Sequence, residues 1–310
     1  LPWDQAQEVA FECEPGTLNE TKLKALKDLG VTRLSLGVEN FSDDVLKANN
    51  RAHDAGAIDR AYKTARDVGF DQINIDLIAG MLEETPDNWQ ACIDRTLELA
   101  PDCVTVYQME IPMNTTIYKS MREAGLITAP VADWPTKRRW AARAFEQLES
   151  AGYTVTSAYT AVKNPDRTRF VYRDALWRGA DMLALGVSSF GHARGVHYQN
   201  EKDFEPYLER VEANELPIRR AYALTDGQQL IRELVLQFKL GRVSLDYFRR
   251  KFDVELTEHF ADPIHAMQAS GDAKIEDDSI VLTRDALMRV DTLLTAFFEP
   301  EHQPKGGEAS

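Results

Sequence analysis

The chain has 310 residues but only three cysteines, and their positions exclude two common uses of this residue. Cys13, Cys92 and Cys103 are odd in number, which argues against a disulfide framework, and they lack the close spacing of metal ligands. Sparse, unpaired cysteines are typical of proteins from a reducing compartment. We therefore expect a cytoplasmic protein.

The sequence also lacks a long apolar run and an excess of basic residues. No run approaches the roughly 18 apolar residues that cross a bilayer, and no charged-then-apolar leader opens the chain. The formal net charge is -14, whereas phosphate binding depends on clustered Lys and Arg. We expect no membrane span and no nucleic-acid partner. The initiator Met is missing too, and this favours an N-terminally truncated fragment.

What is present is an alternation of short apolar runs with helical patterns. Glu12, Glu39 and Gln108 each close such a run, and Asp76 lies within one. In repeating strand-helix chains of the barrel type, polar groups at the carboxyl ends of strands form the active site. The hydrophobic fraction of 44% is sufficient for one large core or two smaller ones. The pattern indicates an α/β enzyme core.

Local signals predict where several helices and strands begin and end. Thr17 and Glu20 have the spacing of a capping box, and Gly30 follows as a left-handed stop. Thr85 and Pro86 predict the start of a later helix, because Pro suits the first helical position. A further helix is expected from about residue 135 to 150, followed by a strand over residues 153–159.

After about residue 220 the pattern changes from strand-helix alternation to helices with one hairpin. Leu230, Leu234 and Phe238 share a helix face, and the pair Asp277-Asp278 separates two short strand patterns. This order favours a winged-helix-like module. The expected domains are residues 1–160 (partial barrel), 161–220 (connecting segment), 221–298 (helical, winged module) and 299–310 (disordered tail).

Four ordered segments resemble the oxygen-independent coproporphyrinogen III oxidase branch of the radical SAM superfamily. They read FECEPGT at residues 11–17, RLSLGVENF at 33–41, NRAH at 50–53 and INIDLIAG at 73–80. The likeness resumes at residues 177–190, WRGADMLALGVSSF, and extends more weakly into the C-terminal module. No single segment is specific, but the ordered set is.

The resemblance implies a partial (β/α)6 TIM-like radical SAM barrel, with about four βα units in this chain. It also implies a 4Fe-4S cluster that reductively cleaves S-adenosylmethionine to a 5'-deoxyadenosyl radical. The family's CxxxCxxC loop for this cluster has no counterpart here. We therefore expect the cluster ligands upstream of Leu1 and an inactive fragment. The implied partners are a tetrapyrrole or other small substrate and an electron donor such as flavodoxin or ferredoxin.

The resemblance also assigns S-adenosylmethionine contacts to residues of this chain. Carboxylates accept from the ribose hydroxyls and the ammonium of S-adenosylmethionine, and an Arg can clamp its carboxylate. Glu12 matches the position that contacts the cluster-bound cofactor, whereas Arg51 and Asp76 match positions that hold a second one. The complete expected set is Glu12, Glu39, Arg51, Asp76, Glu110 and Phe190, and no catalytic residue is assigned.

Three departures from the family pattern bear on activity. Glu39 replaces the usual Gln, so the second cofactor site is open to question. The segment at residues 110–115 differs from the usual one, which would change the pocket wall. The heme chaperones of this fold carry a His-Asn-x-x-Tyr-Trp stretch, where residues 172–177 here read YRDALW. The His expected as heme ligand is therefore absent.

Three classes of function follow. The first is an anaerobic radical enzyme acting on a tetrapyrrole or another substrate, including a methyltransferase of this type. The second is a heme chaperone of the same fold, and the third is a barrel that binds an unrelated ligand or has lost its cofactor. His53 is expected to be a hydrogen-bonding residue, and the spacing of His192 and His197 is weak for a metal site.

Overall fold

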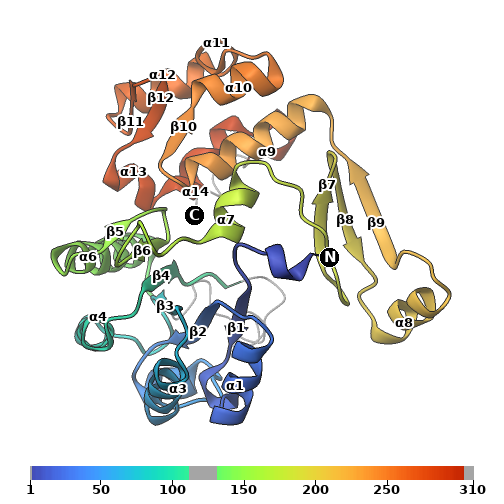
Figure 1. The fold of residues 1–310 in the computed structure, drawn as a ribbon. Helices are drawn as coiled ribbons and strands as arrows, with labels where there is room; N and C mark the ends of the chain where they lie inside the picture. Colours follow the sequence, from blue (N-terminus) through green and yellow to red (C-terminus); the bar gives the residue numbers. More distant parts are fainter. Residues whose placement is uncertain (1, 112–130, 304–310) are drawn as a thin grey trace, which may run out of the picture. The chain divides into compact units, whose positions relative to one another are not determined.

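The computed structural model describes residues 2–111 and 131–303, which fall into two compact units (Figure 1). Unit 1 comprises residues 1–170 and unit 2 residues 171–309. The expected division into four segments remains a prediction. In the described residues, no helix is both long enough and apolar enough to cross a membrane.

Unit 1 is built on a six-stranded sheet in the order β1-β2-β3-β4-β6-β5. Its first four strands run parallel, as the strand-helix alternation predicts, and β6 pairs with β4 in the antiparallel sense. The strands are β1 (Ala10–Cys13), β2 (Arg33–Glu39), β3 (Gln72–Ala79), β4 (Cys103–Gln108), β5 (Thr154–Val155) and β6 (Thr160–Val162). The carboxyl ends of β1 to β4 therefore lie at one edge.

Helices of unit 1 cover the outer face of this sheet (Figure 1). Each helix buries one face of its surface against the rest of the unit. On α4, for example, Trp89 is 1% exposed and stacks on Trp140 of α6. Sequence signals explain their ends, since Thr85 caps α4 and left-handed Gly69 ends α3. The helices are α1 (Glu20–Asp28), α2 (Asp43–Ala48), α3 (Ala55–Val68), α4 (Pro86–Leu99) and α6 (Trp134–Ser150), with 3-10 turns η1 (Trp3–Gln5) and η2 (Pro15–Thr17).

Two local predictions in unit 1 are wrong. Thr17 does not cap the first helix, because Pro15–Thr17 forms a 3-10 turn and Asn19 accepts the backbone N–H of Lys22 instead. Residues 153–159 do not form one strand either. Thr154–Val155 and Thr160–Val162 are two short strands joined by a turn, in which Ser157 accepts a hydrogen bond from the backbone of Tyr159.

Unit 2 contains two three-stranded antiparallel sheets. One has the order β7-β8-β9 and the other β10-β12-β11. The strands are β7 (Phe190–Ala193), β8 (Val196–Asn200), β9 (Ile218–Ala223), β10 (Arg242–Ser244), β11 (Ala273–Glu276) and β12 (Ser279–Leu282). The helices are α7 (Val171–Trp177), α8 (Phe204–Glu212), α9 (Asp226–Phe238), α10 (Leu245–Phe252), α11 (Leu256–His259), α12 (Ala261–Ala269), α13 (Arg284–Met288) and α14 (Val290–Leu294).

The predicted hairpin and helix stripe of unit 2 are confirmed. Asp277 and Asp278 both have positive φ in the turn between β11 and β12, and Leu230, Leu234 and Phe238 of α9 are buried. That this part is a winged-helix module remains a prediction. The 3-10 turns η3 (Thr295–Phe297) and η4 (Pro300–His302) follow, so the expected tail begins with an ordered turn, and its last residues lie outside the described part.

Candidate active site

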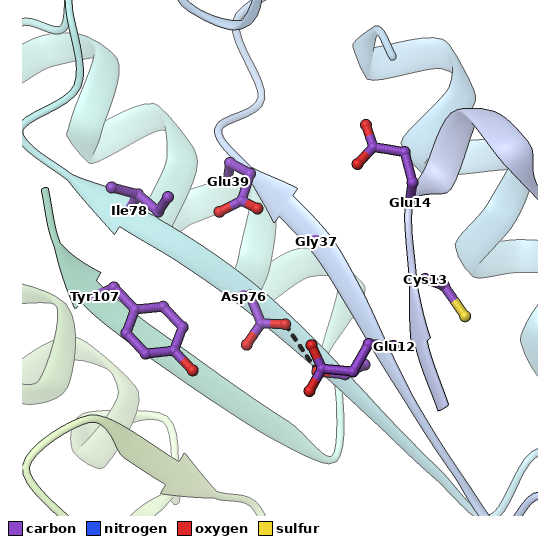
Figure 2. Close-up of a pocket in the computed structure, with 9 residues that line it drawn as sticks. Glu12, Cys13, Glu14, Gly37, Glu39, Asp76, Ile78 and Tyr107 are labelled. Carbon is purple, nitrogen blue, oxygen red and sulfur yellow. Dashed lines mark hydrogen bonds between the residues drawn. The ribbon is translucent and has the colours of Figure 1, made fainter. Parts of the chain in front are cut away.

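A pocket of about 380 Å³ lies at the carboxyl ends of β1 to β4 in unit 1. Figure 2 shows the carboxylates of Glu12, Glu39 and Asp76 and the ring of Tyr107 turned toward one space. Strand alternation places them there, since every second residue of a strand faces the same side. The lining residues are Glu12, Cys13, Glu14, Ser35, Gly37, Glu39, Asp76, Ile78 and Tyr107.

Asp76 is held by a buried network of polar side chains that crosses three strands. Ser35 donates to one Asp76 oxygen at 2.8 Å, and Asn74 donates to the other at 2.8 Å. Thr105 donates in turn to the Asn74 side-chain oxygen at 3.0 Å. Burial raises the pKa of Asp76, and these hydrogen bonds oppose the rise. The network fixes the rotamer of a carboxyl group that is costly to ionise without a cationic partner.

Glu39 reaches the pocket from an irregular end of β2. The pairing with β3 shifts register between Gly37 and Glu39, and the Glu39 backbone is left-handed, with φ of 64°. This conformation is uncommon for a residue with a Cβ and is characteristic of functional sites. Burial raises the pKa of Glu39 to about 7, although the Arg51 guanidinium 3.4 Å away opposes the rise. Glu39 can therefore hold or release a proton near neutral pH.

The backbone after Glu39 is fixed by Glu84, in the loop between β3 and α4. Asn40 donates to Glu84 at 2.7 Å, and the backbone N–H groups of Gly80 and Met81 donate to the other Glu84 oxygen at 2.5 and 3.1 Å. Burial raises the pKa of Glu84 to about 7 as well. Glu84 thus joins the loops that follow β2 and β3 at the edge of the pocket.

His53 is confirmed as a hydrogen-bonding residue beside the pocket. Its fully buried ring contacts the Glu14 carboxylate through Nδ1 and lies 3.1 Å from the Val38 carbonyl oxygen through Nε2. His53 thus connects the loop before α3 with the ends of β1 and β2.

The cysteines do not form a cluster site. Cys13 is on β1 and Cys103 on β4, with two strands between them, so about 14 Å separates these backbones. Cys92 lies on α4, and burial raises the pKa of Cys13 and of Cys92 to about 12, which keeps both as neutral thiols. Neither spacing nor ionisation suits iron ligation.

The structure brings together four of the six predicted contacts. Glu12, Glu39 and Asp76 line the pocket, and Arg51 joins them through its ion pair with Glu39. Glu110 is not a lining residue; its charge acts on Lys137 of α6. Phe190 belongs to unit 2, where its ring stacks on His197. Residues 112–115 of the segment that departs from the family pattern lie outside the described part of the chain.

Among the other predicted polar residues, Gln108 ends β4 as expected but does not line the pocket, whereas Tyr107 does. His192 and His197 face each other across β7 and β8, with ring centroids 6.2 Å apart. In the described part of the chain they have no third residue to complete a metal site. The structure therefore does not support a metal site at His192 and His197.

Sequence reasoning missed Glu14, Ser35 and the role of Glu84. Glu14 lies two positions after Glu12, and Ser35 two before Gly37, so period-two alternation could have assigned both to the inner face. Glu84 has no such signal. Its importance comes from Asn40, a residue 44 positions away.

Comparison with known proteins agrees with this geometry. The profile of the Radical SAM superfamily matches residues 4–96. The chain is 25% identical over 264 residues to the oxygen-independent coproporphyrinogen III oxidase of Helicobacter pylori, covering 82% of this chain and 57% of that protein. The solved structure of coproporphyrinogen III oxidase (HemN) from Escherichia coli matches with a TM-score of 0.78 at 23% identity, covering 94% of this chain and 69% of that one.

The chain is thus similar to proteins of the radical SAM superfamily, and its relatives include oxygen-independent coproporphyrinogen III oxidases. Its fold is that of the solved coproporphyrinogen III oxidase structure, which confirms the predicted α/β class. Another relative is the heme chaperone HemW of Bacillus subtilis, 24% identical over 297 residues, which cover 96% of this chain and 77% of HemW. The chain spans a little under three-fifths of the Helicobacter pylori oxidase and 58% of the Escherichia coli enzyme.

Proposed function

We propose that the pocket at the ends of β1 to β4 binds S-adenosylmethionine for a radical oxidoreductase of the coproporphyrinogen III oxidase type, whose substrate is a tetrapyrrole. One observation carries this proposal: Glu12, Glu39 and Asp76 line one pocket, with Arg51 paired to Glu39. Relatives that carry the oxidase name support the substrate class.

The residues present fit S-adenosylmethionine. The cofactor carries a sulfonium, an ammonium and two ribose hydroxyls, which are donors or cations, and a single carboxylate. The four acidic residues that line the pocket, Glu12, Glu14, Glu39 and Asp76, complement the cationic and donor groups, and Arg51 complements the carboxylate. A volume of about 380 Å³ lies within the usual range of small-molecule pockets.

The chain's own groups would hold the cofactor and set its orientation. Asp76, fixed by Ser35 and Asn74, offers oxygens that need no reorganisation when a donor arrives. Glu39 ionises near neutral pH and would then attract a cationic group. Bound S-adenosylmethionine supplies the adenosyl group for hydrogen abstraction in this superfamily.

The described residues do not fit the 4Fe-4S cluster, because Cys13, Cys92 and Cys103 lie on separate elements and are buried. We therefore propose that this chain alone is inactive. We also propose that the active protein takes electrons from a donor such as flavodoxin or ferredoxin. We propose no nucleic-acid partner.

Calorimetric titration of S-adenosylmethionine into the chain tests the proposal. Asp76→Asn and Glu12→Gln should each weaken binding about tenfold or more, since hydrogen bonds to charged groups contribute roughly 1.5–3 kcal/mol. Asp71→Asn is the matched control, because Asp71 adjoins the opposite end of β3 and its side chain is 73% exposed. Absence of binding, or equal loss in all three variants, would contradict the proposal.

A heme chaperone is the second candidate, because HemW of Bacillus subtilis matches over more of its own length than the oxidases do. The absorption spectrum of the chain mixed with heme distinguishes the chaperone function from the oxidase function. A ligated-heme spectrum at equimolar heme would favour the chaperone.

A further inference from the structure

One face of the sheet β7-β8-β9 in unit 2 combines aromatic rings with cationic and hydrogen-bonding groups. Residues that pair across antiparallel strands project from the same face, and so does every second residue along a strand. The register therefore places six side chains together in two rows: Phe190, Gln199 and Arg220, and next to them His192, His197 and Tyr222. None of these six is aliphatic or acidic, although the chain has a net charge of -14. We call these six residues the aromatic face.

Arg220 is held on the aromatic face by its neighbours. Its Nε donates to the Gln199 side-chain oxygen at 2.9 Å, and buried Gln199 in turn donates to the Ser188 carbonyl oxygen at 3.2 Å. The guanidinium lies 6.0 Å from the centroid of the Phe190 ring. In the described part of the chain, no acidic side chain pairs with Arg220. Its terminal N–H groups are therefore available to an anionic ligand.

The rings of the aromatic face are exposed to solvent. His197 stacks on Phe190, with ring centroids 5.6 Å apart and an angle of 15° between the planes. Phe190 is 47% exposed and Tyr222 57%, and exposed His197 lies on the strand between them. Three neighbouring strands span about 10 Å, so this surface is wider than one aromatic ring. Exposed aromatic side chains beside an unpaired cation indicate a binding surface.

We propose that the aromatic face binds a tetrapyrrole that carries carboxylate groups. Its linked pyrrole rings stack on Phe190, His197 and Tyr222, and Arg220 donates two parallel hydrogen bonds to one carboxylate. Charge complementarity supports an anionic ligand, because no acidic residue of the face repels it. Several stacking side chains favour a ligand with several rings. The tetrapyrrole class rests on the proposed function, and the aromatic face adds a site on unit 2 to the pocket of unit 1.

Fluorescence titration with coproporphyrin III, the stable oxidised form of coproporphyrinogen III, tests this proposal. Arg220→Gln should weaken binding about tenfold or more, because a charge-assisted hydrogen bond to a carboxylate is lost. Tyr222→Ala should weaken binding about fivefold, because a stacking surface is lost. Arg250→Gln is the matched control, since Arg250 of α10 has a side chain that is 75% exposed and pairs with Asp246. No binding by the wild-type chain, or equal affinity in all four chains, would overturn the proposal.

The dependence of binding on salt tests whether Arg220 acts through its charge. The affinity of the wild-type chain should fall between about 0.05 and 0.5 M NaCl, and Arg220→Gln should lose less affinity over this range. Equal losses in the two chains would show that Arg220 does not pair with a carboxylate of the ligand, and the proposal would fail.

Other occupants of the aromatic face give different results. Binding of AMP that depends on Arg220 and Tyr222, without binding of coproporphyrin III, would identify a nucleotide site. A dimer in sedimentation that becomes a monomer in Tyr222→Ala would identify a second copy of the chain. Either result overturns the proposal.

S-adenosylmethionine titration keeps this inference separate from the proposed function. If S-adenosylmethionine binds and coproporphyrin III does not, the aromatic face alone is rejected. If S-adenosylmethionine does not bind, the proposed function fails, whereas the coproporphyrin III titration still decides what the aromatic face binds.

Discussion

At the scale of single residues, the pocket is defined by carboxyl groups that the fold makes costly to ionise. Asp76 is almost completely buried within its hydrogen-bond network, and Glu39 has a pKa of about 7. A cationic ligand would stabilise the ionised forms of both groups. The pocket is therefore suited to ligands that bring positive charge.

Glu39 makes the stability of the chain depend on pH. Its pKa is raised from 4.5 to about 7 in the folded state, so the folded chain binds this proton more tightly than the unfolded chain. Its contribution to stability is complete below the unfolded pKa and is lost as pH rises toward 7. Glu39→Gln should therefore gain stability over the wild type across this window, by at most about 3 kcal/mol.

Urea unfolding at several pH values measures this difference. Glu98→Gln is the control, because it is the same substitution at a side chain that is 65% exposed. Parallel profiles for Glu39→Gln and the wild type would show that Glu39 ionises normally in the folded chain.

At the scale of elements, the residue predicted to cap α1 lies in a 3-10 turn, and another residue caps the helix. Asn19 has an extended backbone and accepts from Lys22 at 2.9 Å, whereas Thr17 donates its hydroxyl to the Glu14 carbonyl. Asn19→Ala should cost about 1 kcal/mol of unfolding free energy, and Thr17→Ala less than about half of that. Chemical denaturation of both variants checks this, and the reverse order would contradict the assigned cap.

Polar residues at the ends of the predicted strands indicated a site that contains Glu12, Glu39 and Asp76, because the carboxyl ends of parallel strands share one edge. The same local reasoning failed at residues 153–159. There, pairing of β6 with β4 decides which residues are strand, and the middle pair of that register, Val104 and Ala161, is 57 positions apart in the sequence. Local sequence patterns could not predict the contact between Glu14 and His53 either, because the two residues are 39 positions apart.

At the scale of the whole molecule, the chain has the pocket that we propose for S-adenosylmethionine but no cysteine set suited to a 4Fe-4S cluster. Anaerobic reconstitution with iron and sulfide should leave this chain without a stable cluster, because its three thiols lie buried on three separate elements. Iron analysis and the absorption spectrum after desalting check the result. A bound 4Fe-4S cluster that disappears in Cys13→Ser would contradict this account.

The most direct test of the central claim is a crystal structure of the chain with S-adenosylmethionine. We expect the ligand at the ends of β1 to β4, within hydrogen-bonding distance of Glu12, Glu39 and Asp76. Ligand bound elsewhere, or an empty pocket at a saturating concentration, would contradict the claim.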